Sequence, residues 1–264
     1  MEKIIERMKK IKTGKILDFA TGGGQFVNLL MNSLGKYDRI TGIDTNEKAA
    51  KAFEANFKDK PVEFINKDAY NTGFKNESFE MVTLSNSLHH FDDIDKILAE
   101  MKRVLKKGGY YIINEMHCDE GQSEPQKTHI MLHHWWASVD SRLGIFHAET
   151  LKKKAIEKLV KKLKPAESEM FEYAYRVEDP LDPKLTEYLQ NSIEPYVNRL
   201  KDHEDFEMLR TRGEELKFRL KKIGYSPADS FFFIGKNKFA NVLSGIFYQD
   251  STKLIQTLFL TDSF

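Results

Sequence analysis

The fold of this chain is decided by the stretch Lys15-Ile16-Leu17-Asp18-Phe19-Ala20-Thr21-Gly22-Gly23-Gly24. An apolar run that carries one carboxylate, Asp18, leads directly into three glycines, and a helical segment continues to about residue 34. A strand that passes through a glycine turn into a helix opens many parallel sheets, and ligands bind at such turns. Glycine lets the backbone approach a ligand because no Cβ stands in the way. A plain glycine-rich turn is the alternative interpretation of this stretch alone.

Segments typical of strands and helices alternate on both sides of this turn. Apolar runs predict strands at residues 15–20, 39–44, 62–66, 79–84 and 110–114, and helical spacing predicts helices at 4–11, 25–34, 47–57 and 94–105. Strands that alternate with amphipathic helices imply a doubly wound, mostly parallel sheet with helices on both faces. We therefore predict an α/β fold with residues 1–116 as its core.

The alternation is interrupted beyond residue 117. The sequence predicts helices at 125–143, 150–163, 185–200 and 206–223, with a break at Pro195, and strands at 168–177 and 230–234. This gives a seven-stranded sheet. We predict a helical insertion with a return helix at 117–165, the last strands with an inserted helical pair at 166–236, and a C-terminal tail of unknown role at 237–264. The insertions are expected to form a helical cap over the ligand edge of the sheet.

Composition excludes several classes of protein. The chain has 264 residues, with 41 Lys and Arg against 40 Asp and Glu, so it has no global basic field for nucleic acid. Its longest apolar runs are too short to cross a membrane, and its start does not resemble an export signal. The single cysteine, Cys118, allows neither an internal disulfide nor a thiolate metal cage. We expect a cytoplasmic monomer or homodimer that binds neither nucleic acid nor membrane.

A second carboxylate, Asp44, ends the predicted strand at residues 39–44, twenty residues after Gly24. A carboxylate at this place can accept hydrogen bonds from both hydroxyls of a ribose, as it does in dinucleotide-binding folds. The dinucleotide fingerprint G-x-G-x-x-G fails here, because its third glycine position falls on Val27. A nicotinamide-dependent oxidoreductase is therefore disfavoured.

The motif D-x-A-T-G-x-G, Asp18 to Gly24, resembles the first motif of class I S-adenosylmethionine-dependent methyltransferases, and its Ala20 variant is similar to the ubiquinone/menaquinone C-methyltransferase branch. The other matching segments are Asp44, Lys67-Asp68-Ala69, Ser85 to Phe91, Glu100 to Gly109 and the late strand at 230–236. The resemblance covers residues 14–116 most strongly. It implies a Rossmann-like methyltransferase fold that uses S-adenosylmethionine and releases S-adenosylhomocysteine.

The resemblance also implies a role for each matching residue. It places the methionine moiety against the backbone of Ala20 and Gly22, in the turn that Gly24 completes, and Asn86 beside the sulfonium. It places the ribose on Asp44. The adenine is expected between Thr45 and Ala69, with its amino group on Asp68. Asp18 is expected to shape the turn and to contact the methionine amine through water. Ala20 and Thr45 depart from the commoner residues of the family.

The acceptor side is predicted from a cluster of histidines. Five of the eight histidines fall between residues 117 and 147, and His129 and His133 share a helical face with Trp136. These three residues predict an aromatic acceptor pocket with a histidine base, against the alternative of an ordinary packed amphipathic helix. A metal site built from the His129/His133 pair with His147 or Glu149 is disfavoured, so no metal is expected. His89 and His90 are interpreted as structural residues or as the edge of the cofactor site.

The predicted function is in-line methyl transfer from S-adenosylmethionine to a small-molecule acceptor, with histidine as a possible base. The main alternative is a catalytically inactive S-adenosylmethionine-binding subunit of a larger assembly. A nicotinamide-dependent oxidoreductase is the third interpretation.

Overall fold

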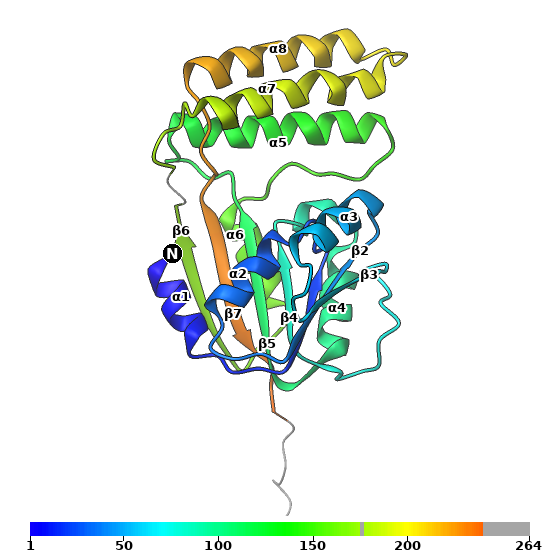
Figure 1. The fold of residues 1–264 in the computed structure, drawn as a ribbon, viewed down its shortest axis with the longest axis vertical. Coiled ribbons are helices and arrows are strands. Elements are labelled where there is room, and N and C mark those ends of the chain that lie inside the picture. The colour runs from blue at the N-terminus through cyan, green and yellow to red at the C-terminus, as the bar shows by residue number, and fades with distance from the viewer. Residues whose placement is uncertain (175–176, 240–264) are drawn as a thin grey trace, which may run out of the picture.

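A computed structural model describes residues 1–174 and 177–239. Figure 1 shows a central sheet flanked by helices, with three long helices lying beyond one of its ends. The strands are β1 (Lys15–Phe19), β2 (Arg39–Asp44), β3 (Val62–Asn66), β4 (Phe79–Ser85), β5 (Leu105–Met116), β6 (Glu167–Tyr173) and β7 (Ser230–Lys236). The helices are α1 (Glu2–Lys9), α2 (Gln25–Ser33), α3 (Glu47–Asn56), α4 (Ile94–Val104), α5 (Glu124–Arg142), α6 (Lys153–Lys161), α7 (Pro183–Val197) and α8 (Phe206–Lys222), with 3₁₀ turns η1 (Leu88–His90) and η2 (Asn198–Leu200).

The seven strands form one sheet in the order β3-β2-β1-β4-β5-β7-β6. Strands β1 to β5 pair in parallel, whereas β7 runs antiparallel to both of its neighbours, β5 and β6. The order of the strands reverses between β1 and β4, which is where open parallel sheets bind ligands. The predicted mostly parallel α/β sheet with a helical cap is confirmed.

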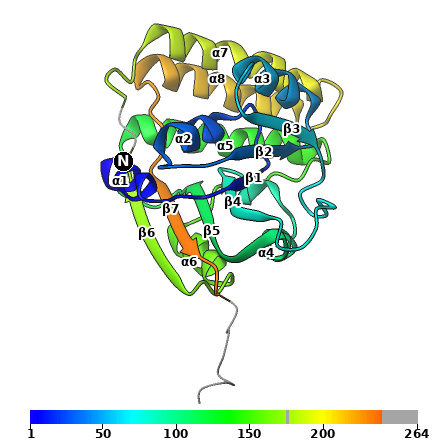
Figure 2. The ribbon, with the colours of Figure 1, turned by 60° about the horizontal axis from the view of Figure 1, so that its bottom comes forward.

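Two apolar cores cover the two faces of this sheet, because successive side chains of a strand point to opposite faces. Leu17 of β1 belongs to the core on the side of α4 and α6, whereas Ile16 belongs to the core on the side of α1, α2 and α3. Figure 2 shows these two sets of helices on opposite sides of the strands. Buried residues continue to the end of β1, where Asp18 is 1% exposed. The core therefore extends to the edge at which the site lies.

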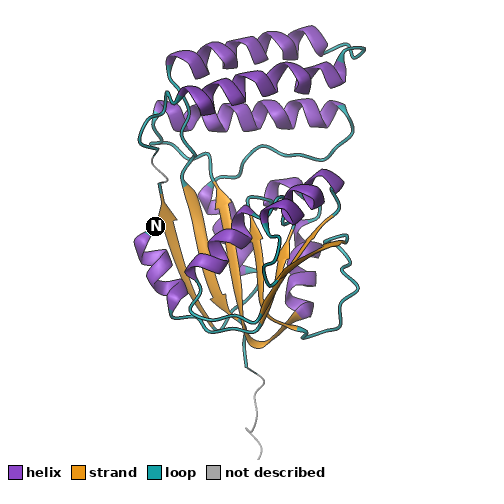
Figure 3. Ribbon diagram, in the orientation of Figure 1, coloured by secondary structure: helices purple, strands orange, loops and turns teal. Residues whose placement is uncertain are grey.

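The cap is a three-helix layer built from both insertions. Figure 3 shows α5, α7 and α8 lying side by side beyond the end of the sheet. They share an apolar core of their own, in which Trp135 of α5 is 1% exposed and donates from Nε1 to the carbonyl of Leu209, 2.8 Å away. The helix α6, from the first insertion, packs instead on the sheet through Ile156 and Val160. The first insertion thus contributes one helix to the cap and one to the sheet.

Three predicted boundaries differ from the structure. Strand β5 begins at Leu105 rather than at 110, because a register irregularity between Phe79 and Met81 allows β4 to pair with it earlier. Helix α7 continues through Pro195, which lies two residues before the helix ends. Because proline has no backbone N–H, it removes one hydrogen bond from the last turn of the helix. Strand β6 ends at Tyr173. The tail prediction falls mostly on residues 240–264, which lie outside the described residues.

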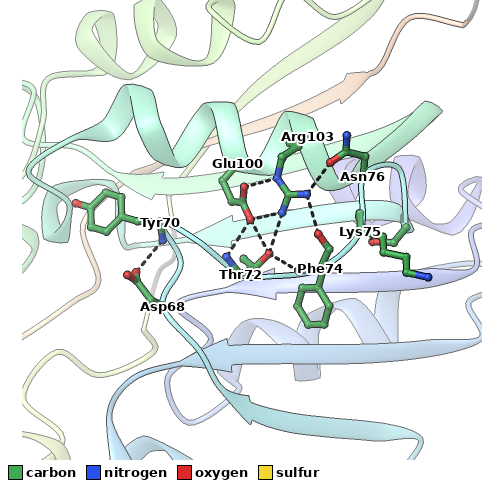
Figure 4. Close-up of polar contacts among 9 residues, drawn as sticks. Asp68, Tyr70, Thr72, Phe74, Lys75, Asn76, Glu100 and Arg103 are labelled. Carbon is green, nitrogen blue, oxygen red and sulfur yellow. Dashed lines mark hydrogen bonds and ion pairs between the residues drawn. The ribbon is translucent and has the colours of Figure 1, made fainter.

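The segment that joins β3 to β4 is fixed by a partly buried ion pair beneath it (Figure 4). The carboxylate of Glu100 accepts from the backbone N–H and the hydroxyl of Thr72, at 2.9 and 2.6 Å, and pairs with the guanidinium of Arg103 at 2.6 Å. Burial acts to raise the pKa of Glu100, but these partners outweigh it and hold the pKa at about 2.

Within the described residues, no helix combines the length and apolar character that crossing a membrane requires.

Candidate active site

A cavity of about 680 Å³ opens at the carboxyl ends of β1, β2 and β4. Its volume lies within the range of small-molecule sites in proteins. The predicted residues on its wall are Asp18, Ala20, Gly22, Asp44, Thr45 and Asn86, and the remaining wall residues are Thr21, Gln25, Phe26, Asn46, Ser85, Ser87, His90, Phe91, Ile145 and Phe146. The cavity therefore spans the strand-order reversal and reaches the loop that follows α5.

The glycine turn after β1 depends on left-handed backbone conformations. Ala20, Gly22 and Gly24 have φ angles of 48°, 52° and 84°. A Cβ on Gly24 would lie 2.2 Å from the ring of Phe57, so Gly24 is required by packing and does not line the cavity. A Cβ on Gly22 would meet nothing within 4 Å. Gly22 is thus the glycine of this turn that leaves room on the wall of the cavity.

The carboxylate of Asp44 is held by backbone donors on both of its oxygens. It accepts from the N–H of Gly22 at 3.0 Å and from the N–H of Asn46 at 2.9 Å. Each carboxylate oxygen can accept two hydrogen bonds, so both oxygens keep capacity for hydroxyl donors in the cavity. Asp44 therefore joins the end of β2 to the glycine turn and presents an acceptor pair.

Asp18 is a buried carboxylate on the inner wall of the cavity. It accepts from the hydroxyl of Thr21 at 2.7 Å and from the hydroxyl of Thr83 at 2.5 Å. Burial raises the pKa of Asp18 to about 6, the two hydroxyls act against this rise, and the charge of Asp44 adds to it. A cation placed in the cavity would favour the ionised form of Asp18.

Asp68 and Ala69, assigned to adenine, do not line the cavity. Asp68 is exposed and accepts from the N–H of Tyr70 at 2.8 Å, as Figure 4 shows. The side chain of Ala69 packs into the core beside β1 and β4 because it points inward from the segment after β3. The structure therefore leaves Thr45 as the residue of the adenine set that lies on the wall, and the roles of Asp68 and Ala69 stay predictions.

Asn86 lies on the wall at the end of β4 with φ 46°. Its N–H donates to the carbonyl of Asn114 at 2.8 Å, and its side-chain oxygen accepts from the N–H of Met116 at 2.9 Å. Both bonds reach β5, so this strand fixes the position of Asn86. Asparagine tolerates a left-handed conformation better than most residues, which explains the residue type.

The predicted catalytic residues His129, His133 and Trp136 are not on the cavity wall. The ring of His133 packs on the ring of His89 at 4.6 Å between centres and on Trp136 at 5.8 Å. Burial, and then the neighbouring imidazoles, lower the pKa of His133. The Nδ1 of His129 accepts from the N–H of Ala228 at 2.9 Å. The face of α5 that carries His133 meets a layer of histidines rather than the cavity itself.

Sequence reasoning missed the aromatic and apolar part of the wall. Ile145 and Phe146, in the loop after α5, are 47% and 49% exposed, and Phe91 follows η1. Two adjacent apolar residues after Gly144 are the signal that was available. It also missed Glu115, which is fully buried near the end of β5 and accepts from the N–H groups of Ser87 and Leu88. The available signal for Glu115 was a charged residue near the end of an apolar strand, which is the same pattern that Asp18 shows in β1.

The chain matches a family model described as a methyltransferase domain over residues 17–113. It is 34% identical over 115 residues to demethylmenaquinone methyltransferase of Thermotoga maritima, covering 44% of this chain and 49% of that protein. It is 33% identical over 96 residues to the ubiquinone/menaquinone biosynthesis C-methyltransferase of Desulfotalea psychrophila, covering 36% and 39%. The chain thus spans about half the length, or less, of these curated relatives.

Solved structures share the fold at low sequence identity. The YcgJ protein of Bacillus subtilis has a TM-score of 0.53 at 14% identity, covering 90% of this chain and 97% of that chain. Phosphoethanolamine N-methyltransferase 2 of Haemonchus contortus, solved with phosphomonomethylethanolamine and S-adenosylhomocysteine, has a TM-score of 0.53 at 20% identity, covering 90% and 52%. Residues 17–113 therefore match a methyltransferase domain, and this part of the chain is similar to the ubiquinone and menaquinone C-methyltransferases.

Proposed function

We propose that this chain transfers the methyl group of S-adenosylmethionine to a small-molecule acceptor. The observation that carries the proposal is the cavity at the strand-order reversal, where Asp18, Gly22 and Asp44 meet within the matched domain. When bound, S-adenosylmethionine supplies a methyl group on a positively charged sulfur, which leaves as a neutral thioether. The protein then has to hold donor and acceptor in line and to exclude water.

The residues present fit the donor. Gly22 leaves the wall open where the methionine part would lie, and the buried Asp18 supplies a negative charge for its ammonium group. Asp44 offers oxygen acceptors to the two ribose hydroxyls, and Thr45 continues the wall towards the adenine. Asn86, fixed by β5, would flank the sulfur. A polar, two-carboxylate wall of this kind suits a donor that carries both a ribose and an ammonium group.

The acceptor side suits a planar, largely apolar molecule. Phe91, Ile145 and Phe146 line the cavity, and His90 is the imidazole on the same wall. Aromatic walls bind flat rings by stacking and by burial of apolar area. The relatives named above act on demethylmenaquinone or serve ubiquinone and menaquinone biosynthesis, so we propose a quinol or related phenol as the acceptor class. His129 and His133, which were first assigned as a histidine base, do not line the cavity, so that assignment stays a prediction.

We expect the purified chain to transfer a radiolabelled methyl group from S-adenosylmethionine to a reduced naphthoquinone. A label recovered in the organic extract is the readout. Gly22→Val places a β-branched side chain at a positive φ and in open space of the cavity, so it is expected to abolish transfer. Binding of S-adenosylmethionine without transfer to quinols or phenols contradicts the acceptor class, whereas binding of NAD in its place contradicts the methyltransferase proposal.

Removing the Asp44 carboxylate is expected to weaken binding of S-adenosylmethionine by about 1 to 3 kcal/mol, the range for losing hydrogen bonds to a charged group. Isothermal calorimetry on Asp44→Ala measures the loss. Glu54→Ala, which removes an exposed carboxylate from α3, is the matched control and should bind as the unmodified protein does. Unchanged affinity in a folded Asp44→Ala protein removes Asp44 from the site.

The affinity for S-adenosylmethionine is expected to rise with pH because Asp18, with its pKa raised to about 6, must lose its proton to face an ammonium group. Linkage gives an affinity about tenfold weaker at about pH 5 than at about pH 7. The same raised pKa means that the free energy of unfolding falls as pH increases through this region. Asp18→Asn should abolish the pH dependence of binding. An unchanged pH profile in that variant assigns the effect to another group.

A further inference from the structure

Five histidine rings from three separate segments pack together beside the cavity. His89 and His90 belong to η1, His129 and His133 to α5, and His147 to the loop after α5. The ring centres of His90 and His147 are 4.1 Å apart, those of His89 and His90 are 4.4 Å apart, and those of His89 and His133 are 4.6 Å apart. The docking of the cap onto the methyltransferase domain creates this histidine cluster.

Several imidazole nitrogens in the histidine cluster are buried and have no protein partner. Within the described residues, these atoms are Nε2 of His89, Nε2 of His147 and Nδ1 of His133. Leaving a buried polar atom unsatisfied costs about 1 to 3 kcal/mol. Half of the six unsatisfied buried side-chain atoms found in the described residues therefore lie in one cluster. Two of them, Nε2 of His89 and Nε2 of His147, lie on histidines that also come together with His90, which points to a common ligand that accepts nitrogen lone pairs.

Two of these histidines are oriented by carboxylates. Nδ1 of His89 lies 2.6 Å from a Glu115 oxygen, and Nδ1 of His147 lies 2.8 Å from an Asp140 oxygen. A carboxylate partner keeps the proton on Nδ1, so Nε2 carries the lone pair. Histidines that ligate a metal typically donate their other nitrogen to a carboxylate in this way.

The carboxylates are themselves fixed in place. Glu115 accepts from the N–H groups of Ser87 and Leu88, at 3.0 and 2.9 Å. Asp140 accepts from the hydroxyl of Tyr196 at 2.7 Å and from Arg199 at 3.0 Å. The orientation of the two imidazoles is therefore set by the domain at Glu115 and by the cap at Asp140.

We propose that His89, His90 and His147 bind a divalent transition-metal ion of the Zn²⁺ type. One ring nitrogen from each lies within 4.8 Å of the others. When Zn–N distances are about 2.0–2.1 Å, two ligand nitrogens of a tetrahedral site are about 3.4 Å apart. A rotation of the imidazole rings would bring the three nitrogens from their present spacing to this one. Three histidines with a remaining open position form a catalytic rather than a purely structural zinc site. This inference replaces the expectation of no metal, which weighed the His129/His133 pair with His147 or Glu149 as the third ligand.

The fourth position of the ion would face the acceptor, because His90 also lines the cavity. A Zn²⁺ ion at this place would bind an oxygen donor, so the proposed acceptor class is narrowed to molecules whose phenol or quinol oxygen lies near the methylated atom. This assignment of the acceptor rests on the proposed function. Metal binding itself does not, and it is measured without any methyl donor.

The experiment uses the untagged full chain, stripped of metal with a chelator and titrated with Zn²⁺ by competition against a chromophoric chelator. We expect one ion per chain, and loss of at least about 100-fold in affinity for His147→Gln and for His90→Ala, since even outer-shell changes cost 10–100-fold. Co²⁺ in place of Zn²⁺ should give the visible absorption of a tetrahedral site. His203→Ala removes a histidine outside the cluster and is the matched control.

A positioning role is tested with Glu115→Gln. The amide oxygen still accepts from the backbone of η1, but the charge that orients His89 is lost, so Zn²⁺ affinity should fall about 10- to 100-fold while the fold is kept. Binding of S-adenosylmethionine by each variant, measured separately, reports on the proposed function. Zn²⁺ binding that is absent in the unmodified protein, or unchanged in His147→Gln and His90→Ala, overturns the metal site even where S-adenosylmethionine binds normally.

Discussion

The parallel pairing of β1 with β2 on one side and β4 on the other is the constraint on which the site depends. In this register Asp18 lies opposite Gly42 and Thr83, so the ends of all three strands reach one edge of the sheet. If the register of β1 shifted by one residue, the side chain of Asp18 would point to the opposite face of the sheet and away from the cavity, because side chains alternate along a strand. The hydrogen bond that the N–H of Gly22 donates to the carboxylate of Asp44 then joins the glycine turn to the neighbouring strand β2.

The protein uses buried carboxylates in two different ways. Glu100 is neutralised by Arg103, and its pKa is accordingly low, so it serves to hold the segment after β3. Among the described residues, the hydrogen-bond partners of the Asp18 carboxylate are the hydroxyls of Thr21 and Thr83, and burial raises its pKa to about 6. A buried carboxylate without a cationic partner is costly for the folded protein. Such a group is expected where a bound cation supplies the missing charge, and the ammonium group of the methyl donor meets that requirement.

Local patterns predicted one wall of the cavity, whereas long-range packing determines the wall that carries His90, Ile145 and Phe146. The strand-turn-helix sequence placed Asp18, Gly22 and Asp44 on one wall because each follows from the end of a parallel strand. The contact between His90 and His147 joins residues 57 positions apart and depends on how the cap docks, which no local spacing records. Spacing also assigned His133 to the acceptor pocket, although His133 does not line the cavity and packs on His89 and Trp136 instead. Gly24 matched the motif but serves the packing of Phe57.

We propose that the methyl donor lies across the ends of β1, β2 and β4 with its reactive end towards the cap. A crystal structure with S-adenosylhomocysteine bound would show this arrangement. We expect the adenosine beside Asp44 and Thr45, and the sulfur between Asn86 and the wall formed by His90. A ligand found outside this cavity, or one whose sulfur points away from His90, would show that the donor does not bind in this way.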